Sequence, residues 1–442
     1  MKGKEMKNSR IIYAGILTLA ACLLLAGLAI AGESNQLIDK LVEKNILTAS
    51  EAEELQGSMV PSWVEKIKLG GDLRLRHDTQ WRDEDSGRYH RNRERFRLRL
   101  KMSARTSDTT EVGVRLASGA GEQNTTNQSF DTHARGKGIY IDQAYAKWKA
   151  TDFLTVTAGK HGNPLETSSL VWDSDVNPEG VSESFSFPVG DSTTLFVNLG
   201  QWIIEELNEK AFNTDPTLLT WQVGGDIKMG EDVGLTLAAT YYDFIHLDDL
   251  EWEAGSLGDD DDFMGYNNRH GQQMIFDSRG DLLNEFGCVE VGARLKLKKV
   301  LPVPVSLFAS YIRNLDQDIN DLLRDGVDPG NSDPADLAAY GGDDRDTGWQ
   351  IGFDAGKKKK KGDLYFQYLY QQLEDYAFPA VFVDSDFHGG GTNNKGHKAE
   401  IVYCLKDNIS LAATGFLTER EDEAKDGQKD EDRIQLDAIL KF

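Results

Sequence analysis

Polar and apolar residues alternate strictly in the segment RERFRLRLKM, residues 93–102. Four cations, Arg95, Arg97, Arg99 and Lys101, alternate there with four apolar residues, Phe96, Leu98, Leu100 and Met102. Residues two apart point in nearly opposite directions on an α-helix, whereas they share one face of a β-strand. The pattern therefore predicts a β-strand with one basic face and one apolar face.

The period of two continues from residue 67 to the end of the chain. It predicts an all-β protein of about sixteen strands, at residues 67–78, 91–105, 110–119, 138–149, 153–161, 180–188, 193–206, 217–229, 233–246, 286–298, 303–314, 347–355, 362–375, 395–406, 408–419 and 432–442.

The connections between these strands alternate in length. Short ones such as SDTT, GED and DN are followed by long ones such as 120–137, 162–179 and 247–285. A soluble sandwich has no reason to place long loops at every second connection, whereas a transmembrane up-and-down barrel has short periplasmic turns and long external loops. We therefore expect a transmembrane antiparallel β-barrel at residues 63–442, with both of its ends on the periplasmic side.

The faces of the predicted strands agree with a barrel in lipid. Leu364, Phe366 and Tyr368 share one face, and Trp221 and Val223 oppose Thr220 and Gln222. Apolar residues then face outward and polar residues inward. Aromatic residues near strand ends, such as Trp148, Trp221, Tyr241 and Trp349, fit interfacial girdles. The last strand ends in Phe442, which resembles the assembly signal of outer-membrane barrels. The faces of 138–149 and 153–161 are not assigned by this pattern.

The N-terminal region differs from the rest. Lys2, Lys4, Lys7 and Arg10 precede an apolar run that ends in Ala29-Ile30-Ala31, which predicts a cleaved signal peptide at residues 1–31. An uncleaved anchor, or a lipoprotein signal ending at Cys22, are the alternatives. Helical spacing at 33–59 and a capping box at Ser50 and Glu53 predict a short periplasmic helical hairpin within 32–62. This hairpin either mediates contacts with other barrels or the cell wall, or is an amphipathic lead-in to the barrel.

Net charge excludes one class of partner. The chain carries −24, and removal of residues 1–31, which carry a net +3, leaves about −27. Such an acidic chain lacks the basic surface that nucleic acid binding needs. Cys288 and Cys404 fall on strands four apart, roughly 19 Å by strand spacing, so we expect free thiols rather than a disulfide.

Several stretches together resemble a known family along most of the chain. They are LIDKLVEKNILTASEAEEL, GDLRLRHD, RERFRLRL, VRLASG, IDQAYAKW, VWDSDVNPEGV and DSDFHGGGTNNKGHKAEIVYCLKDN. The chain resembles the bacterial putative porin family, which implies an outer-membrane β-barrel channel similar in architecture to general porins. The resemblance implies no particular substrate, and the loops of this chain are unusually acidic for it.

The lumen is where the sequence places its candidate chemistry. With Phe96 and Leu98 toward lipid, seven cations on three adjacent strands share the inward face and form a basic wall: Arg74, Arg76, Arg95, Arg97, Arg99, Lys101 and Arg115. Residues 162–179 form the third external loop, which by resemblance to general porins folds inward, and the constriction candidates on it are Glu166, Asp173, Asp175 and Glu179. Opposed charges across a narrow water-filled path would create a transverse field and set ion preference. In the alternative interpretation, the arginines only pair with Asp72, Asp78 and Glu94 and stiffen the wall.

No catalytic arrangement is found in the sequence. Its eight histidines are scattered, no G-x-S-x-G motif occurs, and no Cys/His spacing indicates zinc. We therefore expect no enzyme activity, no cofactor and no metal. The sequence predicts a Gram-negative outer-membrane porin for passive diffusion of small hydrophilic solutes or ions, with membrane lipid, solutes and further copies in a homotrimer as partners. The alternative is a plugged structural or adhesive barrel.

Overall fold

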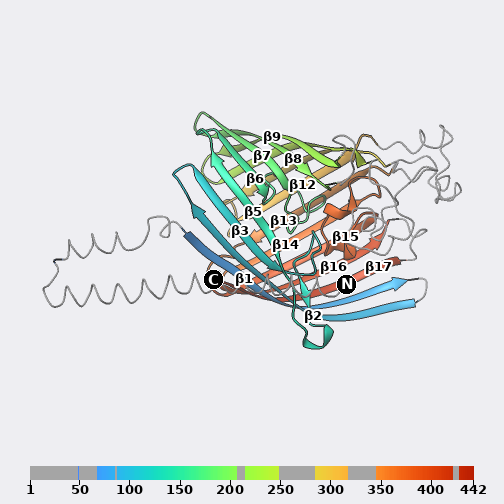
Figure 1. Ribbon diagram of the computed structural model, residues 1–442. Coiled ribbons are helices and arrows are strands. Elements are labelled where there is room, and N and C mark those ends of the chain that lie inside the picture. The colour runs from blue at the N-terminus through green and yellow to red at the C-terminus, as the bar shows by residue number, and fades with distance from the viewer. Residues whose placement is uncertain are drawn as a thin grey trace, which may run out of the picture. The chain divides into compact units, whose positions relative to one another are not determined.

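The computed structural model forms one closed antiparallel β-barrel (Figure 1). The structure describes residue 48 and residues 67–84, 87–206, 215–247, 284–316, 345–421 and 428–442. Its strands are β1 (Ile67–Glu84), β2 (Gly87–Arg105), β3 (Thr110–Ser118), β4 (Gln128–Ser129), β5 (Ile139–Lys149), β6 (Leu154–Lys160), β7 (Glu179–Val189), β8 (Thr193–Ile203), β9 (Thr217–Met229), β10 (Val233–Ile245), β11 (Phe286–Leu297), β12 (Val305–Asn314), β13 (Thr347–Gly356), β14 (Leu364–Leu373), β15 (Asn394–Lys406), β16 (Ile409–Arg420) and β17 (Gln428–Lys441).

Sixteen of these strands make the wall, as the sequence predicts. Each long strand pairs antiparallel with its neighbour along the chain, and β1 closes the ring by pairing with β17. The remaining element, β4, has two residues and pairs with β2 at Arg95 and Phe96. Short 3-10 turns lie at Thr132–Ala134, Ala380–Phe382 and Phe387–Gly389. None of the described residues forms a helix that is long and apolar enough to span a membrane.

The first hairpin is longer than the sequence predicts. We expected β1 to end at residue 78 and β2 to begin at residue 91, but β1 continues to Glu84 and β2 begins at Gly87. Polar residues extend this ladder, because Thr79 Oγ1 donates to Asn92 Oδ1 at 2.9 Å and the rings of Trp81 and His90 stack. The connection between these strands is therefore short, although it lies at the long-loop end of the barrel.

The two faces of the wall carry the predicted polarity. On β9, Val223 is 59% exposed on the outside, while Gln222 is fully buried on the inside. On β17, Ile434 and Leu436 are exposed, while Gln435 is buried. Trp148, Trp221 and Trp349 are also exposed on the outer face. An apolar exterior around a polar interior is the arrangement of a barrel in lipid.

A β-bulge explains the first of the two strands whose faces the pattern left unassigned, β5. Between β3 and β5 the register shifts at Arg115 and Leu116: Arg115 lies opposite Gln143, but Leu116 lies opposite Ile141. Asp142 is the extra residue, and a bulge of this kind reverses the alternation along the strand. The apolar residues on either side of Asp142 therefore do not follow one period of two.

Two further expectations concern the cysteines and the N-terminal region. Cys288 and Cys404 are buried free thiols, as predicted. The expected signal peptide at 1–31 and the helical hairpin within 32–62 lie outside the described residues, apart from Thr48.

Candidate functional site

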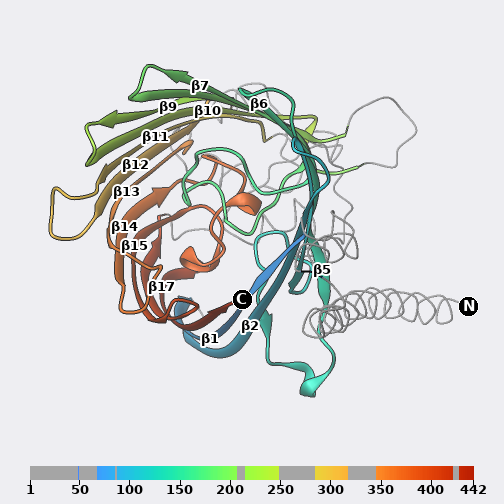
Figure 2. The same ribbon diagram turned by 90° about the vertical axis from the view of Figure 1, so that its left-hand side faces the viewer.

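Two loops lie inside the barrel. The third loop, residues 161–178, joins β6 to β7, and the seventh loop, residues 374–393, joins β14 to β15. Figure 2, which views the ring of strands end-on, shows the third loop in green and the seventh loop in orange within the ring. The apolar side chains of both loops form one buried cluster with the wall, which includes Leu165, Leu170, Val171, Trp172, Val176, Ala377, Phe378, Val381 and Val383.

The two loops are bonded directly to each other. The rings of Trp172 and Phe382 stack with centroids 5.2 Å apart. The backbone N–H of Asp173 donates to the carbonyl of Phe382 at 2.6 Å, and the N–H of Ser385 donates to Asp173 Oδ2 at 2.9 Å. The third and seventh loops therefore make a single packed unit in the lumen.

Glu290 on β11 anchors the third loop to the wall. Its buried carboxylate accepts hydrogen bonds from the Thr167 hydroxyl at 2.7 Å, from the hydroxyl and backbone N–H of Ser168 at 2.7 and 3.1 Å, and from Tyr242 at 2.9 Å. Gln222 on β9 adds a second anchor by bonding both the backbone N–H and the carbonyl of Glu166. Buried polar groups that are fully satisfied in this way specify one conformation.

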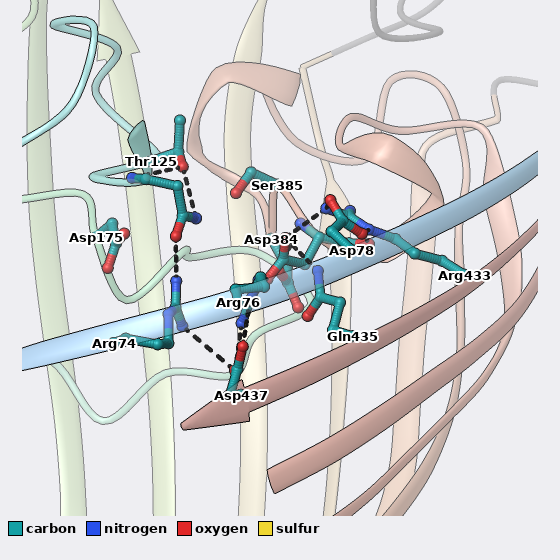
Figure 3. Close-up of polar contacts among 12 residues, drawn as sticks. Arg74, Arg76, Asp78, Thr125, Asp175, Asp384, Ser385, Arg433, Gln435 and Asp437 are labelled. Carbon is teal, nitrogen blue, oxygen red and sulfur yellow. Dashed lines mark hydrogen bonds and ion pairs between the residues drawn. The ribbon is translucent and has the colours of Figure 1, made fainter. Parts of the chain in front are cut away.

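Asp386 anchors the seventh loop to β1 and β17, through Arg76, Arg433 and Gln435, which Figure 3 labels. Its carboxylate accepts from Arg76 at 2.9 Å and from Gln435 at 3.0 Å, and it lies 3.1 Å from Arg433, which also donates to the Asp386 carbonyl. Burial alone would raise the pKa of Asp386, but the charges of Arg76 and Arg433 and then Arg74 outweigh it and hold the pKa well below its usual range. Asp386 is therefore an ionised counterion of the wall.

Glycines let the seventh loop turn against the wall. Gly389, Gly390 and Gly391 all have positive φ, a conformation that costs glycine little and other residues much. A Cβ on Gly389 would lie 3.0 Å from Arg82 Nη2 and 3.2 Å from Glu431 Oε2. The close approach of this backbone to β1 and β17 therefore depends on glycine.

Most of the positive charge of the basic wall is neutralised by ion pairs. Most of its arginines pair with a carboxylate, namely Arg76 with Asp437 and Asp386, Arg97 with Asp72, Arg99 with Asp175, and Arg115 with Asp142. Arg74 is 4.0 Å from Asp437, and Arg95 and Lys101 make no ion pair with a described residue. Asp78 pairs with Arg93 and Arg433, which are not part of the basic wall, and Asp72 pairs with an arginine of the wall, Arg97. Glu94 pairs with none of the described arginines, because it is on the outer face and bonds His77.

The four acidic candidates of the third loop lie in different surroundings. Asp175 is buried and contacts the wall through Arg99, and it also accepts from the N–H and hydroxyl of Thr126. Asp173 is buried and points to the seventh loop. Glu166 is exposed, and Glu179 is the first residue of β7, where it pairs with Lys160. Of the four, Asp175 alone makes a described ion pair with a residue of the basic wall.

Cavities remain beside the packed loops. A cavity of 660 Å³ lies between both inward loops and the basic wall, and it is lined by Arg74, Arg97, Arg115 and Asp384. It shares Asp175 and Asn177 with an outer cavity of 870 Å³, and Ser168 and Lys398 with an inner cavity of 290 Å³. Shared lining residues mean that the three spaces adjoin one another along the interior.

The second inward loop and the residues that hold it were not predicted from the sequence. Asp384, Asp386, Lys398, Arg433 and Asp437 were not among the candidates. The apolar run FPAVFV, residues 378–383, followed by GGG at 389–391 was the available signal, because an external loop in water has no reason to be so apolar. The alternation of polar and apolar residues identifies strands and gives no signal for an inward loop of this kind.

The barrel is closed, has sixteen strands, and is apolar outside and polar inside, and two loops narrow its interior. These features define the class of porin-like β-barrels. Within that class, the chain belongs to the family described as "Putative porin", whose model matches residues 86–274 and 259–442. No curated protein matches the chain.

Solved porin structures are similar to this chain at low sequence identity. OmpF of Salmonella typhi, in a complex with daunomycin, is 11% identical with a TM-score of 0.46, over 85% of this chain and 97% of that one. A triple mutant of Rhodopseudomonas blastica porin is 9% identical with a TM-score of 0.42, over 85% and 100% of the two chains.

Proposed function

We propose that this protein is an outer-membrane porin of a Gram-negative bacterium that allows passive diffusion of small hydrophilic solutes or ions. The observation that carries the proposal is the row of adjoining cavities, which leads past both inward loops and is lined by charged and polar side chains. Transport along such a path needs a concentration gradient and no catalytic group.

The basic wall and the inward loops would form the constriction. Arg97 and Arg115 line the central cavity from β2 and β3, and Asp175 and Asp384 line it from the loops. We propose that these charges act on permeating ions as a transverse field. Because most of the arginines are paired, the field is weaker than seven free cations would produce.

The test is the zero-current potential of the refolded protein in a planar bilayer under a KCl gradient. A steady conductance with a measurable potential of either sign supports an open porin. A correctly inserted barrel that never conducts would contradict the proposal and favour a plugged structural or adhesive barrel. The packed apolar cluster between the loops is the observation that favours this second function.

We also propose that copies of the barrel associate, as a homotrimer, through the outer face of β1 and β2. His77 Nδ1 and Glu94 Oε1 lie 2.6 Å apart on this face, and their side chains are 42% and 57% exposed. Ionisable groups on the lipid face of a barrel are costly, and a subunit contact would remove them from lipid. Sedimentation of the detergent-solubilised protein should give three times the monomer mass, and a monomer would contradict this assembly.

The N-terminal region would complete this arrangement. We propose that residues 1–31 are removed as a signal peptide and that a helical hairpin within 32–62 lies in the periplasm, on the basis of the charge pattern and the capping box. N-terminal sequencing of the protein from outer membranes tests the cleavage after residue 31.

A further inference from the structure

The charges around the central cavity are matched almost one to one. Each carboxylate that lines it, apart from Asp173, has a cation close by: Asp175 has Arg99, Asp384 has Lys398, Glu400 has Lys358, and Asp386 and Asp437 share Arg76, with Arg433 also on Asp386. The lining cations Arg97 and Arg115 are in turn held by Asp72 and Asp142. Matched pairs of this kind leave little net charge for a passing solute.

Arg74 is the exception among the lining cations. Its Nη2 donates to the neutral side chain of Asn127 at 2.5 Å, and its Nη1 is 4.0 Å from Asp437, which Arg76 already holds through two hydrogen bonds (Figure 3). Its buried Nε has no hydrogen-bond acceptor in the described part of the chain. Arg74 therefore adds a positive charge to the cavity that no carboxylate of the described residues takes up fully.

Asp173 lines the cavity without a cation partner among the described residues, and it competes only weakly for the positive charge of Arg74. Asp173 uses its two oxygens to accept the N–H groups of Asp175 and Ser385. Burial, and then repulsion from Asp384 and Asp175, raise the pKa of Asp173 well above its usual range. A carboxyl group that is harder to ionise opposes the charge of Arg74 less than an ordinary aspartate would.

Neighbouring groups add hydrogen-bond donors to this charge. Arg97 lines the same cavity and donates its Nε and Nη2 to Asp72, so its second terminal nitrogen is not engaged there. Ser169 lines the cavity as well, and its hydroxyl accepts a hydrogen bond from Gln350 and can donate its own proton, whereas the hydroxyls of Ser168 and Ser385 already donate to Glu290 and to the Asn124 carbonyl. Guanidinium groups bind carboxylate and phosphate oxygens through paired hydrogen bonds that are stronger than neutral ones.

We propose that Arg74, with Arg97 beside it in the lining, is a binding site in the lumen for the oxyanion group, phosphate or carboxylate, of anionic solutes. The site rests on the proposed porin function and gives it a substrate class. A permeating anion would exchange water for Arg74 and the Ser169 hydroxyl and then leave toward the inner cavity, where Arg294 and Lys398 follow. A site of this kind makes transport of anions saturable.

The test is calorimetric titration of the refolded full-length barrel with inorganic phosphate and, separately, with succinate. Arg74→Gln should weaken binding of the preferred anion about tenfold, since a charge-assisted hydrogen bond contributes about 1.5–3 kcal/mol. Arg95→Gln is the matched control, because it removes an equally unpaired cation from β2 that does not line this cavity, and it should change affinity less than about twofold. Equal losses in both variants, or no loss in Arg74→Gln, would overturn the proposal.

A second variant and a conductance measurement make the result of the titration unambiguous. Asn127→Ala removes the hydrogen bond that orients Arg74 without removing a charge, so it should weaken binding by a smaller factor and serves if Arg74→Gln does not fold. Conductance of the same samples separates the two proposals: a barrel that conducts but binds neither anion refutes the site, whereas one that binds through Arg74 but never conducts refutes the porin function. A preference for phosphate over succinate, or the reverse, identifies the oxyanion class.

Discussion

Trp172 of the third loop stacks on Phe382 of the seventh loop, with ring centroids 5.2 Å apart and an angle of 15° between the ring planes. These residues are 210 positions apart in the chain, and both are packed within the barrel. Because Trp172 also meets Trp202 on β8 edge-on, the contact ties both loops to the wall. The width of the lumen therefore depends on the two loops together.

Loss of this contact should loosen both loops. Trp172→Ala removes a buried ring, and such truncations cost about 3–5 kcal/mol. We expect a lower Tm and a larger, noisier single-channel conductance. Trp148→Ala is the control, because Trp148 is exposed on the outer face. An unchanged conductance in Trp172→Ala would mean that the loops do not limit the path.

Removal of the carboxylate of Glu290 should release the third loop from the wall. Glu290→Ala leaves Thr167, Ser168 and Tyr242 without their common acceptor, and each bond to a charged group contributes about 1.5–3 kcal/mol. Limited proteolysis of the detergent-solubilised variant should then cut within residues 161–178. A cleavage pattern identical to that of the unmodified protein would show that the apolar cluster alone holds the loop.

The anchor of the seventh loop should depend on pH in a defined direction. The pKa of Asp386 is held well below its usual range, so the stability that its ionised form contributes is present above the unfolded pKa of about 3.9 and is lost as pH falls through the folded pKa. Asp386→Asn leaves Arg76 and Arg433 short of a counterion and should lower the free energy of unfolding by about 3–5 kcal/mol at pH 7.

The Tm of the unmodified protein and of Asp386→Asn, measured over a range of pH, tests the direction of this pH dependence. The difference should be constant from pH 7 to about pH 4 and should shrink only in stronger acid. A difference that disappears between pH 7 and pH 5 would contradict the ionised state of Asp386.

The polarity of the wall can be tested by cysteine labelling. Ile401 faces outward and is 46% exposed, whereas Glu400 lines the central cavity from the same strand, β15. In a background without Cys288 and Cys404, a membrane-impermeant maleimide should label Glu400→Cys in lipid vesicles and spare Ile401→Cys. Detergent at a concentration that strips the lipid should expose both, and labelling of Ile401→Cys within vesicles would contradict a lipid-facing outer surface.

Most of the barrel was predictable because strand formation follows a local rule. Residues such as Arg97 and Leu98, or Gln222 and Val223, belong to opposite faces wherever the period of two holds, so the number of strands and their faces follow from the order of residues. Where another interaction replaced that rule, the pattern left the faces of one strand unassigned and placed the ends of the first hairpin wrongly. The bulge at Asp142 reversed the alternation, and bonds among Thr79, Asn92 and their neighbours lengthened the first hairpin.

The site was less predictable, since its charges find partners from distant parts of the chain. Alternation along the chain placed Arg74, Arg76 and Arg99 on one inward face. It could not show that Asp437 and Asp386 hold Arg76 closely, while Arg74 hydrogen-bonds the neutral Asn127 and lies 4.0 Å from Asp437. It also gave equal weight to Asp175, which bonds the wall, and to Glu179, which pairs with Lys160 on the neighbouring strand.

The amino-acid sequence by itself determined the strands, their two faces and the closed barrel, because alternation and turn length act between residues that are close in the chain. Only the tertiary structure decided which loops enter the lumen, which arginines are neutralised and where a cavity remains. Those outcomes depend on contacts between segments as distant as Asp173 and Ser385, or Arg76 and Asp437, whose pairing is set by the closure of the barrel and by the packing of the loops inside it.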